Sequence, residues 1–310
     1  MFLEQALKLR DNRFWKYIVG SVAVIVASFV GQLPLGLAIV YKVLAEGIDM
    51  PDETQIMTLM DSNLTFFLML ISFPVALFGL YLIVKYFHKQ PFVEVATARK
   101  KLDWKRIFFS FGIWAVVSIV SVFGDYYANP EHYEINFKLV PFLTLAVIAI
   151  VLVPLQTSTE EYVFRGYLMQ GFGVLAKNRL FPLLMTSIIF GTMHIFNPEI
   201  QKLGYILLVY YIGTGLFLGI LTLMDDGIEL ALGFHAANNL ITALLVTSDW
   251  TVFQTHSVLK DTAEPSVGFM VFLPVLLVFP ILLVVFAKKY KWTDWKEKLT
   301  GNLILEEKNH

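Results

Sequence analysis

Long apolar runs separated by short polar stretches dominate the sequence, and they predict a bundle of membrane-spanning helices. A run of about 18 or more apolar residues with few charges is long enough to cross the bilayer as a helix. Eight such segments can be placed along the chain. They cover about residues 15–43, 64–84, 107–124, 139 through the Glu160 region, 180–196, 203–224, 228–247 and 267–287.

The stretches between these segments define their ends. Gly20, Gly31 and Pro34 predict a kink in the first segment, and Pro198 closes the fifth, because the residue before a proline resists the helical conformation. Residues 1–14 fit either a short interfacial helix or an ordinary basic flank, and residues 45–62 predict an acidic loop. With no internal repeat and no long linker, we expect residues 1–310 to form a single transmembrane domain.

Composition supports this fold class. Hydrophobic residues make up 57% of the chain and charged residues only 16%, against about 25% charged residues in soluble domains. We therefore expect an all-α, polytopic membrane protein whose surroundings are the lipid bilayer. The absence of cysteine excludes disulfides, thiolate catalysis and cysteine-based zinc sites. A net charge of −1 gives no reason to expect a nucleic-acid partner.

The distribution of Lys and Arg predicts the orientation in the cell membrane. These residues gather at the N-terminus, between segments two and three, between segments four and five, and after segment eight. The positive-inside rule then places both termini in the cytoplasm, as an even number of spans requires. The acidic loop between segments six and seven is the one mismatch: it holds Asp225, Asp226 and Glu229 on the side expected to be basic.

Three ionisable residues at the end of the fourth segment are the first candidates for chemistry. Glu161 and Arg165 are four residues apart, so on a helix they share a face and predict an ion pair. Glu160 is rotated from Glu161 by about 100° and is left unpaired, which suits a general base. The alternative is that both carboxylates merely mark the end of a membrane helix.

Two later segments each carry one histidine. His194 follows Phe190 by four residues, beside Gly191, which would allow close approach of another helix. His235 precedes Asn239 by four residues, on a face lined with small residues. Structural alternatives are a histidine bonded to a backbone carbonyl and an interhelical hydrogen-bonded pair. The other four histidines fall in predicted loops or the tail: His88, His132, His256 and His310.

Together these groups would supply what amide hydrolysis requires. Glu160 would take a proton from a water that His194 helps to hold, and His235 with Asn239 would donate hydrogen bonds to the oxyanion. Glu161 and Arg165 would brace the helix. A zinc ion held by Glu160, His194 and His235 is an equally good reading, because these ligand types fit both mechanisms.

At this point the sequence resembles a known family. The patterns Glu-Glu-x-x-x-Arg, Phe-x-x-x-His and His-x-x-x-Asn, in this order across residues 139–247, are similar to those of the CPBP intramembrane proteases, which include CAAX prenyl endopeptidases. The resemblance implies eight helices around a cytoplasm-facing polar cavity, with residues 139–247 as the catalytic core. It also implies a protein or peptide substrate, lipidated in some members, and either a metal-assisted or a metal-free glutamate mechanism.

Two other functions use the same residue types. Glu and His also form proton relays, so a proton-coupled transporter is one alternative. A non-catalytic scaffold or bacteriocin-immunity protein on the same fold is another. One geometric condition tests the hydrolytic hypothesis. Glu160 and His194 are each about 17 residues from Lys177, whereas His235 is only nine from Asp226. All three meet only if the hairpin around Lys177 protrudes by about 10 Å.

Overall fold

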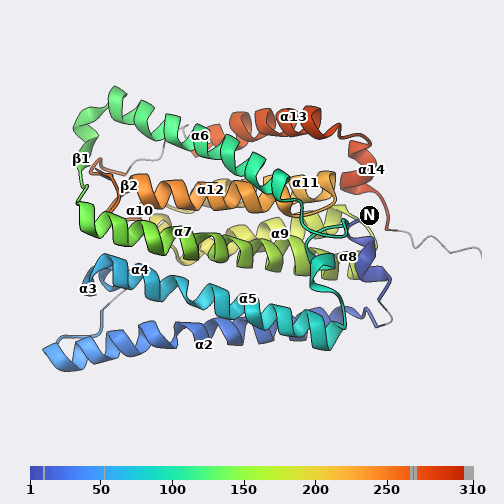
Figure 1. Ribbon diagram of the computed structural model, residues 1–310, viewed down its shortest axis with the longest axis horizontal. Helices are drawn as coiled ribbons and strands as arrows, with labels where there is room; N and C mark the ends of the chain where they lie inside the picture. Colours follow the sequence, from blue (N-terminus) through green and yellow to red (C-terminus); the bar gives the residue numbers. More distant parts are fainter. Residues whose placement is uncertain (10, 52, 266–267, 269–270, 304–310) are drawn as a thin grey trace, which may run out of the picture.

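The apolar segments form long helices that run side by side, with a small sheet at one end (Figure 1). The computed structural model describes residues 1–310 except 10, 52, 266–267, 269–270 and 304–310. The predicted all-α membrane fold is confirmed. The elements, in chain order, are α1 Glu4–Leu7, α2 Phe14–Glu46, α3 Glu53–Leu59, α4 Ser62–Leu70, α5 Ser72–Leu82, η1 Ile83–His88, η2 Phe92–Val95, α6 Trp104–Ala128, η3 Pro130–His132, β1 Tyr133–Ile135, α7 Leu139–Glu161, η4 Tyr162–Leu168, α8 Met169–Ala176, α9 Leu180–Thr192, η5 Met193–Phe196, α10 Pro198–Leu203, α11 Leu207–Asp225, α12 Glu229–Leu245, β2 Val246–Thr247, β3 Leu259–Asp261, η7 Pro274–Val278, α13 Phe279–Tyr290 and α14 Trp295–Thr300.

Five helices in the described part of the chain are long and apolar enough to cross a membrane. Their ranges are Phe14–Glu46, Ser62–His88, Trp104–Ala128, Leu139–Ala176 and Leu207–Asp225. The other three predicted segments are helical but shorter, at Leu180–Phe196, in α12 and in η7 with α13. The count of eight crossings therefore stays a prediction.

Several predicted boundaries need correction. The expected acidic loop contains α3, and the sixth segment begins at Leu207 because α10 ends at Gly204, whose φ of +81° is a conformation that glycine adopts without strain. The seventh helix ends at Leu245 and continues as β2. The predicted start of the eighth segment, Val267, lies outside the described residues, as does His310.

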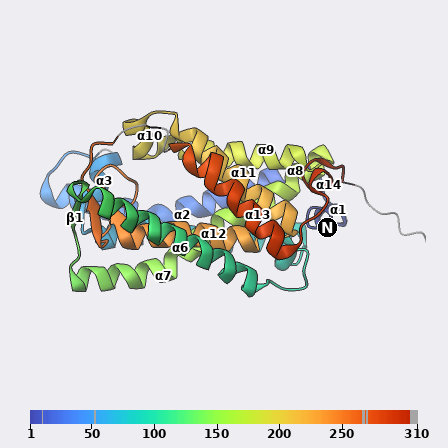
Figure 2. The ribbon, with the colours of Figure 1, turned by 90° about the horizontal axis from the view of Figure 1, so that it is seen from above.

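Helix α12 lies at the centre of the bundle, packed between α6, α7 and α11 (Figures 1 and 2). Small residues permit this packing: Ala231 and Ala237 are fully buried, and a Cβ at Gly233 would lie 2.1 Å from the Ile107 carbonyl oxygen of α6. The predicted seam of small residues is thus confirmed. By contrast, α2 at the edge exposes many apolar side chains, such as Phe29 and Leu37, as a lipid-facing helix would.

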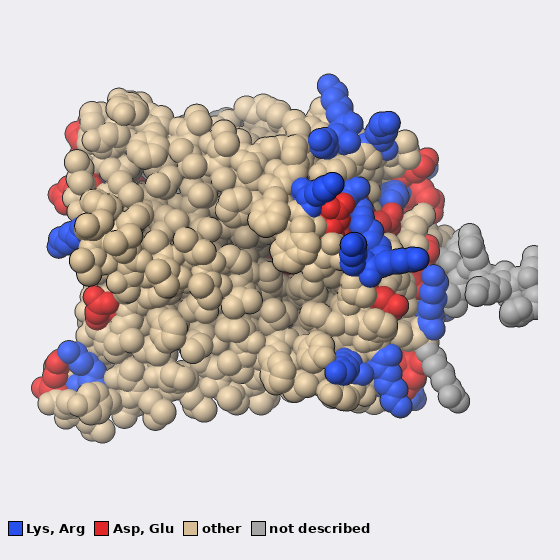
Figure 3. All heavy atoms as spheres, viewed as in Figure 1, with Lys and Arg blue, Asp and Glu red and all other residues tan. Residues whose placement is uncertain are grey.

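The two ends of the bundle differ in chemistry. At one end β1, β3 and β2 form a small sheet in which β3 pairs antiparallel with β1 and parallel with β2. Lys and Arg side chains crowd the opposite end, beside the N-terminus and α14 (Figure 3). We call this second region the charged end.

The acidic turn between α11 and α12 lies at the charged end and is neutralised there. Asp225 accepts from Arg99 and Arg106, and Glu229 accepts from Arg99 at 3.2 Å. Both carboxylates are buried, and Asp226 pairs with Lys298. The acidic residues that did not fit the positive-inside pattern are therefore paired with arginines and a lysine at the charged end.

Segments from both ends of the chain cover the hairpin between α8 and α9. The residues around α1 do not lie flat on a membrane surface, because Phe2, Leu3 and Ala6 are buried against the bundle. After α14, the Leu303 amide donates to the Lys177 carbonyl at 2.9 Å. The Arg179 amide donates to Gly301 at 3.0 Å. The hairpin is therefore held by contacts from distant parts of the sequence.

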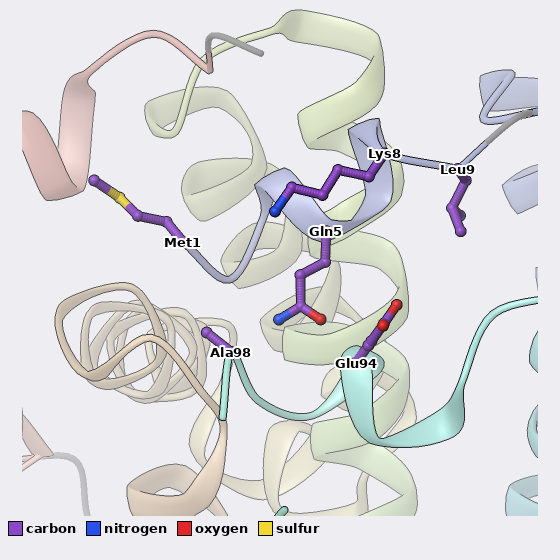
Figure 4. A pocket seen from close by; sticks show the side chains of 6 residues that line it. All are labelled: Met1, Gln5, Lys8, Leu9, Glu94 and Ala98. Atoms are coloured by element: carbon purple, nitrogen blue, oxygen red, sulfur yellow. The ribbon is translucent and has the colours of Figure 1, made fainter. Parts of the chain in front are cut away.

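A surface hollow of about 400 Å³ lies beside α1 (Figure 4). It is lined by Met1, Gln5, Lys8, Leu9, Glu94 and Ala98. None of the residues predicted from the sequence to carry chemistry lines this hollow.

Candidate active site

The Glu160 motif lies where the α-helix α7 widens into the π-helical turn η4. Such π-helical turns within α-helices are rare and occur frequently at functional sites. Arg165 Nη1 donates to Glu161 Oε1 at 3.0 Å, and neither side chain is exposed to solvent. The predicted ion pair is confirmed. Arg165 also donates to the Gly215 carbonyl of α11 at 3.3 Å, which ties the motif to a third helix.

His235 of α12 connects the two carboxylates. Its Nδ1 lies 2.7 Å from Glu161 Oε1, and its Nε2 lies 3.5 Å from Glu160 Oε2. Since an ionised carboxylate only accepts, Nδ1 carries a proton and donates it to Glu161. The expectation that Glu160 stands unpaired is therefore wrong. His235 and Glu160 therefore lie at one site, as the hydrolytic hypothesis requires, whereas the protrusion of the Lys177 hairpin stays a prediction.

Gln156 is a member of the site that the sequence did not predict. It lies one turn before Glu160 on α7, is buried, and donates from Nε2 to Glu160 Oε1 at 2.5 Å. Its Oε1 accepts from Asn239 Nδ2 at 3.0 Å. The amide of Gln156 thus connects the predicted base to the predicted oxyanion donor.

His194 lies in η5, directly after α9, and is held from two sides. Its Nδ1 lies 2.8 Å from the Phe190 carbonyl oxygen, which can only accept, so Nδ1 is the protonated nitrogen. Its ring stacks on Tyr211 of α11 with centroids 4.1 Å apart. Phe190 lies between the two histidines, with ring centroids 4.9 Å from His194 and 6.0 Å from His235. Nε2 is the atom of His194 left for another partner.

Close packing of α9 on α11 sets the position of this histidine. A Cβ at Gly191 would lie 2.7 Å from the backbone nitrogen of Ile212. The predicted close approach at Gly191 is therefore confirmed, and its partner is the helix that also supplies Tyr211.

The possible zinc ligands do not form a preassembled set. Among the described residues, no group of three His, Asp or Glu side chains lies close enough to hold a metal ion. His235 instead directs one nitrogen to each of two carboxylates. The arrangement does not fit a three-ligand metal centre, and we derive no chemical step through a metal.

Sequence reasoning missed three residues that contact the predicted site residues, namely Gln156, Asn238 and Tyr211, and a fourth, Trp114, that bonds to Asn238. Gln156 could have been found, because a glutamine four residues before Glu160 in an apolar helix faces the same side. Trp114 and Tyr211 belong to other helices, and no spacing in the sequence connects them to the motifs.

These observations define a multi-pass helical membrane protein with two carboxylates, two histidines and three amides gathered in its interior. Comparison with known proteins gives the family. The sequence model of a family described as type II CAAX prenyl endopeptidase Rce1-like matches residues 138–241, the stretch that runs from α7 to α12. The chain is also 31% identical over 247 residues to the uncharacterized protein YyaK of Bacillus subtilis (strain 168), covering 78% of this chain and 81% of that protein.

The chain belongs to the Rce1-like family. Membership implies a membrane protease of the CAAX type. No solved structure matches this chain.

Proposed function

We propose that this protein is an intramembrane endopeptidase that hydrolyses a peptide bond near the cytoplasmic leaflet, with Glu160 as the general base. The observation that carries the proposal is the approach of Glu160 Oε2 to His235 Nε2 at 3.5 Å, inside a helical bundle. A carboxylate is costly to bury in such a place unless it is needed for function. The side chain of Glu160 keeps 18% exposure, whereas that of Glu161 has none. Glu160 is therefore the carboxylate that a water can reach.

In this reaction Glu160 carries one proton from the attacking water to the leaving nitrogen. Glu160 takes a proton from water, which His194 Nε2 helps to orient, and the oxygen attacks the scissile carbonyl carbon. The Asn239 amide donates to the resulting oxyanion, and so does His235 Nε2 when the ring is an imidazolium with a proton on each nitrogen. Glu160 then gives its proton to the leaving nitrogen, the C–N bond breaks, and a carboxylic acid and an amine leave. Glu161 accepts from His235 Nδ1 throughout and fixes the ring.

The family match and the position of the site support a proposal for the substrate class. We propose a protein or peptide presented from the membrane, with a prenylated CAAX terminus as the first candidate. The charged end, with its Lys and Arg side chains, would face the cytoplasm of a cell-membrane protein and so place both termini there. Neither the family match nor the fold favours the transporter or scaffold alternatives.

The experiment compares purified wild type with Glu160→Gln and His194→Ala on a quenched fluorescent peptide ending in a farnesylated CAAX sequence. We expect Glu160→Gln to lower kcat about 10³-fold and His194→Ala about 10²-fold, because proton transfer by a positioned group contributes on that scale. Lys202→Ala, in α10 outside the site, is the control and should match wild type.

The same peptide without the farnesyl group tests the lipid requirement, and a peptide library tests a broader specificity. Equal cleavage by wild type and both variants would contradict the protease proposal. A chelator arm tests the metal question: activity lost with chelator and restored by zinc would contradict the metal-free route.

A further inference from the structure

A chain of hydrogen bonds runs from α6 through α12 to Glu160 on α7. Trp114 Nε1 donates to Asn238 Oδ1 at 3.0 Å, and Asn238 Nδ2 donates to Asn239 Oδ1 at 3.0 Å. Asn239 Nδ2 then donates to Gln156 Oε1 at 3.0 Å, and Gln156 Nε2 to Glu160 Oε1 at 2.5 Å. Three side-chain amides therefore lie in series between an indole and a carboxylate.

The two ends of this chain decide which way every amide points. An indole N–H only donates, and an ionised carboxylate only accepts. Asn238 must present its oxygen to Trp114, so its nitrogen faces Asn239. Asn239 must then accept through its oxygen from Asn238 and donate through its nitrogen to Gln156, and Gln156 in turn donates through its nitrogen to Glu160. All three amides therefore present oxygen toward Trp114 and nitrogen toward Glu160.

This direction matters for Asn239. An amide nitrogen carries two hydrogens, of which Gln156 takes one, and the second is the donor that the oxyanion requires. The reversed amide would bring its oxygen to that place and repel the developing negative charge. The ionised Glu160 carboxylate selects this direction, but once Glu160 has taken the proton from water it can donate as well as accept, and Trp114 is then the end of the chain that still fixes the direction.

We propose that Trp114 and Asn238 are positioning residues that fix the orientation of the Asn239 amide, and through Gln156 that of the Glu160 carboxylate. The proposal rests on the proposed function, in which Asn239 serves the oxyanion. Trp114 acts on Glu160 through α12 and not by a bond of its own, and its buried ring packs on that of Phe234 with centroids 4.4 Å apart.

The test removes the donor and keeps the ring. Trp114→Phe retains aromatic packing against Phe234 and Phe279 but leaves Asn238 without its donor. On the farnesylated peptide we expect kcat to fall about tenfold, less than the effect of deleting an oxyanion donor outright. KM should stay within about twofold, because the orientation matters mainly in the transition state. Trp292→Phe is the matched control: it removes an indole bond to Asp225 at the charged end and should leave kcat unchanged.

A double substitution separates one network from two independent effects. Asn238→Leu breaks the same chain at the next bond, so Trp114→Phe with Asn238→Leu should lose no more than about the larger single effect. Losses that multiply would contradict the proposal. Melting temperatures of all variants establish that the protein is folded.

A second measurement does not depend on activity. In protein with ¹⁵N-labelled Asn and Gln side chains, the NMR signals of Gln156 and Asn239 are assigned from Gln156→Met and Asn239→Leu. Both signals should move in Trp114→Phe and stay in place in Trp292→Phe. If the wild type cleaves nothing, the proposed function fails while these signals still test the orientation. Unmoved signals, or an unchanged kcat in an active enzyme, would overturn the positioning role.

Discussion

Two pairs of carboxylates, Asp225 with Glu229 and Glu160 with Glu161, differ in how their charge is balanced. At the charged end, Asp225 and Glu229 share Arg99 and Arg106, so two anions meet two cations. In the interior, Glu160 and Glu161 have one arginine, Arg165, and it bonds to Glu161. The remaining partners of Glu160 are an amide and a histidine.

The difference separates a structural cluster from a reactive one. An arginine does not exchange a proton with the carboxylate that it holds, because guanidinium stays protonated. A carboxylate held by an amide and an imidazole can gain and lose a proton, since imidazole itself titrates near neutrality. The count of arginines around each pair thus predicts which pair does chemistry.

The largest effect is expected from removal of the interior arginine, Arg165. Arg165→Met leaves Glu161 buried beside His235 without a permanent cation, and loss of one partner of a buried pair costs about 3–5 kcal/mol. We expect a correspondingly lower free energy of unfolding, measured by denaturant titration in detergent micelles, together with loss of peptide cleavage.

The double variant Arg165→Met with Glu161→Leu separates the two roles of this ion pair. Replacing both charges by apolar groups should restore most of the stability. Cleavage should stay low, because His235 then lacks the acceptor for its Nδ1 proton. Full recovery of cleavage in the double variant would show that Glu161 does not position His235.

A weaker effect is expected at the charged end. Arg106→Met leaves Asp225 with Arg99 and the Trp292 indole, so the carboxylate keeps two of its partners. The free energy of unfolding should fall by about 1–2 kcal/mol, below the cost of an unpaired buried charge, because Arg106 is itself partly exposed. At temperatures where the variant is folded, its kcat should equal that of wild type. A fall in kcat would mean that the two carboxylate pairs are coupled.

The smallest effect concerns a fifth carboxyl, that of Glu199, which has no cation partner among the described residues. Glu199 of α10 accepts from the Val252 amide at 3.2 Å, and its second oxygen has no hydrogen-bond partner among the described residues. Burial raises the pKa of this carboxyl above its ordinary value of 4.5, against the opposing effect of the amide hydrogen bonds. The folded protein therefore holds this proton to higher pH than the unfolded chain does.

The folded protein should become less stable as the pH rises through the raised pKa of Glu199. Below the ordinary pKa both states are protonated, and as the pH rises the unfolded chain ionises first, so stability falls through the raised pKa of Glu199. Glu199→Gln should remove this decline, an effect of the order of 1 kcal/mol or less. Thermal unfolding of both proteins across this pH range provides the measurement. Parallel curves would exclude Glu199 as the titrating group.

The helical fold could be predicted because each membrane helix satisfies its own backbone and leaves a long apolar run as its signature. Elements that depend on distant partners could not. β2 and β3 pair across an irregular connection, and α1 is buried by packing rather than by any pattern of its own. The acidic turn at Asp225 contradicted the charge rule because its arginine partners are more than a hundred positions away.

Within the site, local spacing predicted what a single helix determines. The Glu161–Arg165 pair follows from a separation of four residues and is present. Spacing also separated Glu160 from Arg165, but it could not reveal that His235 and Gln156 occupy the vacant side. Which helices surround a side chain depends on the packing of α12 against α6 and α7, and no local pattern encodes that packing.

The bonds that hold the α8–α9 hairpin can form only late in the synthesis of the described chain. Residues 301 and 303 hold the backbone of the turn that joins the Glu160 helix to the His194 helix. Those bonds cannot form until residue 303 has left the ribosome, by which time every helix of the site has already been made. The helices can gather early, but the turn that connects them is secured last. A nascent chain would therefore lack these two bonds to the turn until residue 303 has emerged.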